Sequence, residues 1–154
     1  MNRRDDPLAA LDRFYTDRSL AIACTRGREA IVRRFGTLLA REGFTEQQWR
    51  VMRVLYDFEP VPLVDLCRLC CIHKVSMTRI LRALTERGLL TREKRPNDRR
   101  AYDISLTDEG RAMMRRMTPE ATRIYEGILD DFGPENTREL LRLLKELARI
   151  NERA

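Results

Sequence analysis

In the first third of the chain, apolar and polar positions alternate with the period of a helix. From Ser19 onward, apolar or small residues recur every three or four positions, at Leu20, Cys24, Gly27, Ile31, Phe35 and Leu38. This spacing predicts one helix, which Gly43 ends as a C-terminal glycine. Residues 1–17 are polar and charged and predict a frayed arm or a short first helix.

A capping box opens the next predicted helix. Thr45 can cap the first turn while Gln48 reaches back to the Thr45 backbone. The face of this helix carries apolar side chains at Trp49, Met52, Leu55 and Phe58. Pro60 and Pro62 follow, so the helix should end before them.

Two shorter helices and a change of period come next. Residues 63–71 predict a short helix, 72–74 a turn, and 74–87 a second helix ending at Gly88. Residues 89–94 read as a strand and 95–100 as a turn. Tyr102, Ile104 and Leu106 then alternate with Asp103 and Ser105, as in a half-buried strand, which completes a hairpin.

Two further helices close the chain. Thr107 is a good N-cap, and the helix after it should be kinked or split by Pro119. Gly133 and Pro134 break it, and the last helix gathers an apolar face at Leu140, Leu141, Leu144, Leu147 and Ile150. The expected fold class is mainly α, with the order α-α-α-α-β-β-α-α.

The composition is that of a globular chain with extra charge. The chain has 154 residues, with 43% hydrophobic and 35% charged side chains. No apolar run approaches the roughly 20 residues that span a bilayer, and the N-terminus opens no apolar signal segment. We therefore expect one cytoplasmic domain.

The net charge of +6 is concentrated in one window. Nine basic and three acidic residues lie between Lys74 and Arg100, whereas bases and acids balance in the rest of the chain. Such a focus favours a polyanionic partner, because neutralised phosphates release counterions. Chance clustering on a solvated surface is the alternative.

The helix over 74–87 has the faces of a DNA-reading helix. At about 100° per residue, Met77, Ile80, Leu81 and Leu84 share one side. Following the preceding helix and turn, this helix would enter the major groove of double-stranded DNA. The exposed side would read it with Lys74, Val75, Ser76, Thr78, Arg79 and Arg82. An ordinary amphipathic helix with a solvated basic face is the alternative.

The hairpin tip is strongly basic. Arg95, Arg99 and Arg100 surround Asp98, and a cationic tip of this length could reach a minor groove. Asp98 could pair with an arginine and aim its guanidinium. Otherwise Asp98 is a turn residue that caps its own backbone.

The four cysteines favour packing over chemistry. Cys24, Cys67, Cys70 and Cys71 have only His73 beside them, so four ligands at structural-zinc spacing are lacking and we expect no metal. All four are expected to be buried as small apolar residues, with redox sensing left open. We also expect no cofactor and no enzyme, since nucleophile-elbow and phosphate-loop motifs are missing.

The wing and recognition-helix residues resemble the MarR family of bacterial regulators. The family's wing pattern, D-x-R followed by L-T-x-x-G, is matched by Asp98, Arg100, Leu106, Thr107 and Gly110. The recognition helix and its exit are similar at Ser76-Met77-Thr78-Arg79, Leu84 and Arg87-Gly88-Leu89. Thr45-Glu46-Gln47-Gln48-Trp49-Arg50 and Cys71 are further similar to the branch of homoprotocatechuate-operon repressors (HpaR).

The resemblance implies a homodimeric repressor that binds a pseudo-palindromic operator and releases it on binding a small aromatic acid. It implies one MarR-type domain over residues 1–154, with dimerisation helices at 19–44 and 107–154 and a winged helix-turn-helix over 45–106. It also implies that Arg100 enters the minor groove, steadied by Asp98. A cysteine-based, peroxide-sensing repressor of the same fold is the alternative.

An aromatic acid needs a cation beside an apolar wall. The candidates are Arg18, Arg26, Arg50, Arg53 and His73. Each arginine could instead be a surface charge or half of an ion pair. His73 could instead be a satisfied turn residue or contact a phosphate.

Overall fold

The computed structural model describes residues 18–150, with the side chains of Arg99 and Arg100 excepted. The arm or helix predicted over 1–17 lies outside this range. The chain forms two compact units, residues 1–36 and residues 37–154. In the first unit, α2 (Leu20–Arg34) begins at Ser19, whose hydroxyl accepts a hydrogen bond from the Ile22 N–H at 3.3 Å. None of the α2 residues is buried.

The single helix predicted from Ser19 to Gly43 is wrong, because the chain forms α2 and then α3 (Gly36–Arg41). The break follows from Phe35, whose N–H bonds to the Val32 carbonyl three residues back. Gly36 follows directly, and glycine weakens a helix interior. Gly43 ends α3 with a φ of 69°, as the pattern predicted.

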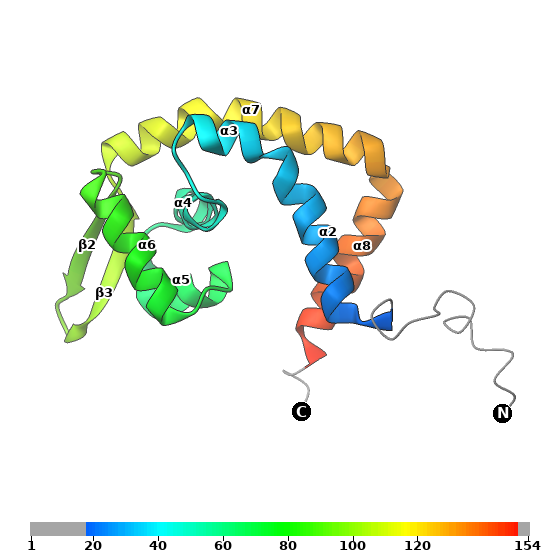
Figure 1. The fold of residues 1–154 in the computed structure, drawn as a ribbon. Coiled ribbons are helices and arrows are strands. Elements are labelled where there is room, and N and C mark those ends of the chain that lie inside the picture. The colour runs from blue at the N-terminus through cyan, green and yellow to red at the C-terminus, as the bar shows by residue number, and fades with distance from the viewer. Residues whose placement is uncertain (1–17, 151–154) are drawn as a thin grey trace, which may run out of the picture. The chain divides into compact units, whose positions relative to one another are not determined.

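The central part of the second unit is a winged helix-turn-helix, which confirms the predicted fold class (Figure 1). Its elements are α4 (Glu46–Phe58), β1 (Val61–Pro62), α5 (Leu63–Cys70), α6 (Lys74–Glu86), β2 (Leu90–Arg95) and β3 (Asp98–Leu106). The capping box at α4 is confirmed: Thr45 and Gln48 exchange hydrogen bonds of 2.9 and 3.1 Å.

The sheet has three strands in the order β1-β3-β2, all antiparallel, so the prediction of a two-stranded hairpin alone was incomplete. β1 pairs Val61 with Ile104 and Pro62 with Asp103. Two residues are too short for an alternation to show in the sequence. Pro62 fits an edge strand, because it lacks an N–H for a second neighbour.

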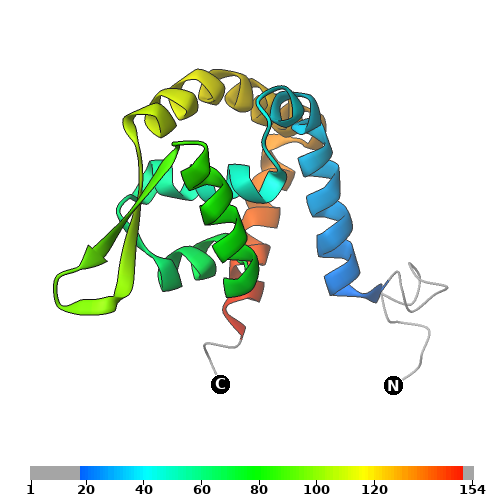
Figure 2. The ribbon, with the colours of Figure 1, turned by 60° about the vertical axis from the view of Figure 1, so that its left-hand side comes forward.

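The hairpin of β2 and β3 projects from the helices (Figure 2). β2 has the predicted six residues, shifted by one position, whereas β3 begins earlier than predicted, so only Pro96 and Asn97 remain at the tip. Ile104 and Leu106 are buried, as their alternation predicted. The register shifts between Lys94 and Arg95, so the tip is irregular.

Two long helices complete the second unit. α7 (Asp108–Phe132) runs unbroken through Pro119. Of the two predicted effects of Pro119, the split is therefore wrong, and the kink stays a prediction. α8 (Pro134–Ala148) follows Gly133 and contains no buried residue. Among residues 18–150, no helix combines the length and the apolar character needed to cross a bilayer.

The core of the winged module is built from residues of many elements. The large side chains with less than 2% exposure include Met52 and Leu55 of α4, Leu66 of α5, Leu81 of α6 and Met114 of α7. Within residues 18–150, no polar or charged residue is buried. An apolar interior thus positions the helices of the winged module.

Candidate nucleic-acid interface and effector pocket

α6 separates a buried face from a polar face as the sequence predicted. Met77, Ile80, Leu81 and Leu84 are at most 8% exposed. On the other side, Val75 is 71% exposed, and Lys74, Thr78, Arg79 and Arg82 are also exposed, with Ser76 half-buried. This is the surface that a major groove would meet.

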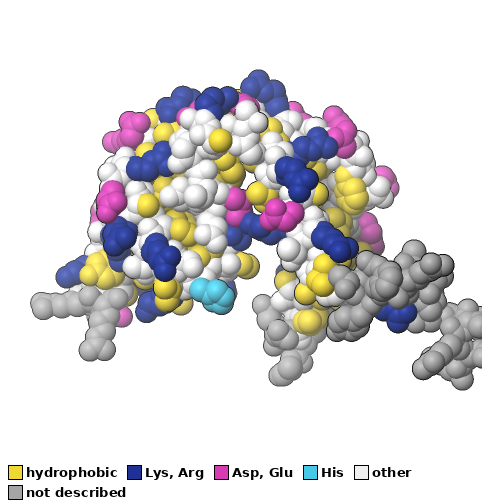
Figure 3. Space-filling view, in the orientation of Figure 1, with side chains coloured by type: hydrophobic (Ala, Val, Ile, Leu, Met, Phe, Trp, Pro, Cys, Tyr) yellow, Lys and Arg dark blue, Asp and Glu magenta, His cyan; other side chains and the backbone are white. Residues whose placement is uncertain are grey.

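The exposed face of α6 keeps much of its hydrogen-bonding capacity. Arg79 makes no ion pair with any residue that the structure describes. Arg82 lies 3.8 Å from Glu86, a weak exposed pair. The Thr78 hydroxyl donates to the Lys74 carbonyl at 2.9 Å. The guanidinium groups of Arg79 and Arg82 are therefore exposed over α6, where Figure 3 shows dark-blue side chains.

Two arginines of the wing are held by contacts within the hairpin. The Arg95 guanidinium donates to the Asp103 carboxylate at 2.8 Å, so its charge is partly neutralised within the hairpin. Arg92 stacks on the Tyr102 ring at 4.9 Å. Asp98 is exposed at the start of β3. The side chains of Arg99 and Arg100 lie outside the described part, so the pairing of Asp98 with Arg100 stays a prediction.

The L-T-x-x-G pattern has a direct structural reason. The Thr107 hydroxyl accepts from the Gly110 N–H at 3.0 Å and donates to the Gly88 carbonyl at 2.6 Å. A Cβ at Gly110 would lie 2.2 Å from the Leu89 carbonyl oxygen, which is far too close. The pattern therefore ties the wing, the exit of α6 and the start of α7 together.

Glu59 is a positioning residue that the sequence did not indicate. Its carboxylate accepts hydrogen bonds from the Leu106 N–H at 2.6 Å and the Arg111 guanidinium at 2.7 Å. The hydrogen bond to Glu59 raises the pKa of Arg111. Glu59 thus joins the end of α4 to β3 and α7, and its partners are about 50 residues away, beyond any local pattern.

A pocket of about 350 Å³ lies between α4 and α7. It is lined by Trp49, Arg53, Thr118, Ala121, Thr122 and Tyr125. Trp49 and Tyr125 supply aromatic walls, Arg53 a cation, and the two threonines hydroxyl groups. Such a mixture suits a flat ring with a carboxylate. Because α4 and α7 are distant in sequence, Trp49 and Tyr125 could not be recognised as pocket residues.

The five ligand candidates are placed differently. Arg53 lines the pocket, where it also bonds to Asp57 at 3.0 Å. Arg50 pairs with Glu46 at 3.4 Å and is not a lining residue of this pocket. Arg18 and Arg26 belong to the first unit, and their role in ligand binding stays a prediction.

His73 lies at the N-cap of α6 and makes no side-chain capping bond. Its exposed ring, cyan in Figure 3, borders a second and more open hollow of about 490 Å³. Val64, Cys67, Arg68, Cys71, Ile72 and Lys74 also line this hollow. His73 is therefore beside the reading helix, away from the pocket of Trp49 and Arg53.

The expectation that all four cysteines are buried is wrong. Cys70 is buried, Cys67 is half-buried, and Cys24 and Cys71 are exposed. Cys71 ends α5 in a left-handed conformation with a φ of 50°, and Cys24 lies on α2, which buries none of its residues. Burial raises the pKa of the Cys70 thiol to about 11, and that of Cys67 is also raised by burial. Among residues 18–150, no group of three potential metal ligands is present.

Comparison with known proteins gives a consistent picture. The sequence profile of the MarR family matches residues 44–102. The chain is 38% identical to the homoprotocatechuate degradative operon repressor of Escherichia coli over 128 residues, which are 83% of this chain and 86% of that one.

Solved structures are similar over most of the chain. NadR in complex with 4-hydroxyphenylacetate is 35% identical, with a TM-score of 0.77 over 86% of this chain and 94% of that one. The repressor CouR bound to a 23-mer DNA duplex is 28% identical, with a TM-score of 0.76 over 90% of this chain and 99% of that one.

Proposed function

Since this chain belongs to the MarR family, we propose that it is a homodimeric transcriptional repressor that binds operator DNA and releases it on binding a small aromatic carboxylic acid. The observation that carries the DNA-binding part is the outward face of α6, with Val75, Arg79 and Arg82 exposed beside a basic wing. A DNA-binding role accounts for the excess of basic residues between Lys74 and Arg100, whereas catalysis does not. The protein would act in the cytoplasm.

In this proposal the groups of the DNA surface have separate tasks. Arg79 and Arg82 hydrogen-bond base edges in the major groove, and Val75 contacts a thymine methyl. Lys74, Ser76 and Thr78 contact phosphates and sugars, which fix the register of the helix. Arg95, Arg99 and Arg100 belong to the wing, where Arg100 enters the minor groove and Asp98 orients it.

DNA binding is tested by gel shift with DNA upstream of the chain's own operon at low salt. Arg79→Ala should weaken binding by about 1–3 kcal/mol and relax the preference at one base pair, whereas Lys74→Ala should weaken all sequences alike and reduce the salt slope by about one. Arg138→Ala on α8 is the matched control, since Arg138 pairs with Glu135 within its own helix. Absence of any shift at low salt would refute DNA binding.

The dimer part rests on the uncovered apolar face of α8. Leu140, Leu141, Leu143 and Leu144 are 39–51% exposed within one chain. A second copy of the chain would cover this face. Two-fold symmetry then predicts two half-sites about one helical turn of DNA apart.

The effector part rests on the pocket between α4 and α7. We place the ring of the acid between Trp49 and Tyr125, and its carboxylate at Arg53, which would exchange Asp57 for the ligand as its partner. The likeness to NadR, whose complex contains 4-hydroxyphenylacetate, supports a phenolic or phenylacetic acid. Binding there would act on α4, which packs on the reading helix, and on α7, which packs on α4.

A thermal-shift screen of phenylacetic, hydroxyphenylacetic and benzoic acids tests the pocket, because a ligand of the native state raises the melting temperature. Arg53→Ala should abolish the shift, whereas Arg50→Ala, one helical turn away, should retain it. The reverse result would move the carboxylate site to Arg50. If both variants keep the thermal shift, the effector binds elsewhere.

One observation favours a second candidate, a thiol-sensing repressor of the same fold. Cys71 is exposed and lines one hollow with Cys67 next to the first residue of α6. Oxidation by a peroxide would convert the Cys71 thiol to a sulfenic acid and the peroxide to an alcohol. If a variant with all four cysteines replaced by serine still loses DNA in peroxide, this candidate is wrong.

A further inference from the structure

The C-terminal end of the reading helix is held by one arginine. Arg87 caps α6, and its guanidinium donates to the Gly43 carbonyl at 2.8 Å and the Glu42 carbonyl at 3.0 Å. It also stacks on the Phe44 ring, 4.3 Å from the ring centre. A planar fork suits two neighbouring acceptors in a way that a lysine ammonium does not. We call these contacts with residues 42–44 the Arg87 clamp.

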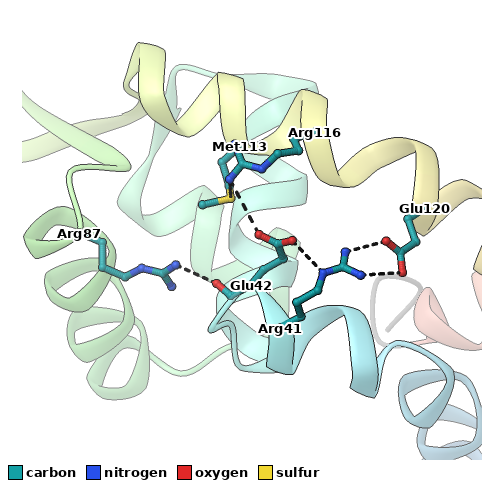
Figure 4. A network of polar contacts seen from close by, with 6 residues as sticks. All are labelled: Arg41, Glu42, Arg87, Met113, Arg116 and Glu120. Atoms are coloured by element: carbon teal, nitrogen blue, oxygen red, sulfur yellow. Dashed lines mark hydrogen bonds and ion pairs between the residues drawn. The ribbon is translucent and has the colours of Figure 1, made fainter.

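Ion pairs connect the turn of residues 42–44 to α7 (Figure 4). The Glu42 carboxylate lies 3.8 Å from Arg116 and 3.2 Å from Arg41. Arg41 also pairs with Glu120 through both carboxylate oxygens, at 2.6 and 3.4 Å, and this contact lowers the pKa of Glu120. Exposed pairs of this kind contribute little stability singly. Their consequence is that the turn follows α7 when α7 moves.

The same turn is joined to the other wall of the pocket. Thr45 follows it directly and caps α4, the helix that places Trp49 and Arg53 in the pocket. On α7, the pocket residues and the ion-pair residues occupy opposite flanks. At 100° per residue, Thr118 and Thr122 lie roughly 120–160° around the helix from Arg116 and Glu120. A roll or tilt of α7 caused by an occupant of the pocket therefore displaces the residues that hold the turn.

The clamp acts at the C-terminal end of α6, whereas the base-reading residues Val75 and Arg79 lie nearer its N-terminal end. α6 has 13 residues and is about 20 Å long. Val75 and Arg79 lie in its N-terminal half, whereas Arg87 grips the C-terminal end. A small movement of the clamped end would swing the reading end within the groove, where ångström shifts break bidentate contacts.

We propose that Arg87 is the positioning residue that couples occupancy of the pocket to the orientation of α6. This inference rests on the proposed function, in which α6 reads DNA and the pocket takes the effector. Coupling between two sites requires an element on which both act. Here that element is the turn of residues 42–44. Arg87 holds it from α6 and Arg116 from α7, and the neighbouring Arg41 of α3 pairs with Glu120 of α7.

A double-mutant cycle on DNA affinity tests the proposal without an identified effector. Thr122→Trp places an indole in the pocket and so imitates an occupant. The DNA is the duplex that the wild-type chain selects from a random pool, with affinity measured by fluorescence anisotropy at fixed salt. With Arg87 present, Thr122→Trp should weaken binding about 5- to 150-fold, the usual range of coupling between sites. With Arg87→Ala, the same change should have less than a twofold effect.

Two results would overturn the coupling. Either the same weakening by Thr122→Trp in both backgrounds, or no weakening in the presence of Arg87, would mean that Arg87 transmits nothing from the pocket. Circular dichroism checks that each variant is folded, and Thr118→Phe fills the pocket from the preceding turn of α7 if Thr122→Trp does not fold.

Arg87→Lys separates positioning from a phosphate contact. Lysine keeps the charge and loses the two-carbonyl geometry, so the salt slope of DNA binding should stay as in the wild type while the effect of Thr122→Trp is lost. Arg138→Ala should leave both unchanged. If Arg87→Lys retains the full effect of Thr122→Trp, charge alone matters and the clamp is not the coupling element. A wild-type chain that selects no duplex refutes the proposed function as well, whereas an additive cycle refutes only the clamp.

Discussion

α6 and α8 are both amphipathic helices, but the chain covers the apolar face of only one of them. α6 buries Met77, Leu81 and Leu84 completely, under a sheet and other helices. α8 has leucines at comparable spacing, and none of its residues is buried. An apolar stripe thus predicts that a helix face is covered, but it does not predict whether the same chain or another copy covers it.

Local patterns in the sequence could predict some of these elements and not others. The elements of the winged module follow from local signals: the capping box at Thr45, the period of α6, and the turn and glycine at the wing. The predicted faces of α6 were correct, and the elements that pack on it, α4, α5 and β2, flank it closely in the sequence. β1 was missed because two residues have no period, and the break at Phe35 was missed because the apolar stripe continues across it.

In the candidate site, too, residues within one helix could be predicted, whereas residues brought together by packing could not. The outward residues of α6 come from one helix and could be derived from its period. The pocket joins Trp49 and Arg53 to residues 118–125, so its members are brought together only by the packing of α4 on α7. The Arg87 clamp joins positions 44 residues apart, and a lone arginine before a glycine carries no signal of its distant partners.

The largest expected effect is in the module's own core. Leu81→Ala removes a side chain with no exposed surface and should lower the free energy of unfolding by about 2–5 kcal/mol. Leu141→Ala on α8, where the leucine is 51% exposed, should change it by under about 0.5 kcal/mol in dilute protein. Urea unfolding at low concentration measures both. Equal losses would mean that the chain itself covers α8.

The second-largest expected effect concerns the exposed apolar face of α8. Leu144→Asp puts a carboxylate on the α8 face and should weaken self-association by about 3 kcal/mol, or roughly 100-fold. Sedimentation velocity across a concentration series would show dimers giving way to monomers. Arg142→Gln, on the polar side of the same helix, is the control. An unchanged distribution for Leu144→Asp would show that α8 is not the dimer face.

Gly110→Ala tests the junction between the wing and α7. The added methyl would meet the Leu89 carbonyl at 2.2 Å, so the wing or the first turn of α7 must shift. We expect a loss of about 1–3 kcal/mol in unfolding free energy, as for overpacking. Gly127→Ala, on the same helix with no atom within 4 Å of the new Cβ, should be neutral or stabilising by about 1 kcal/mol. A stable Gly110→Ala variant would contradict the crowding at this position.

The smallest expected effect concerns the N-terminal caps of α7 and α2. Thr107→Ala removes the bond to the Gly110 N–H and the bond to the Gly88 carbonyl, so α7 and the exit of α6 are loosened together. Replacement of such a cap costs about 1 kcal/mol. Ser19→Ala removes a single longer bond on α2, which buries nothing within the described chain, and should cost less in dilute protein. Its cost should rise with protein concentration if α2 is ordered by a second copy, and denaturation at two concentrations measures this. A constant cost would remove α2 from the dimer contact and leave α8 as its proposed basis.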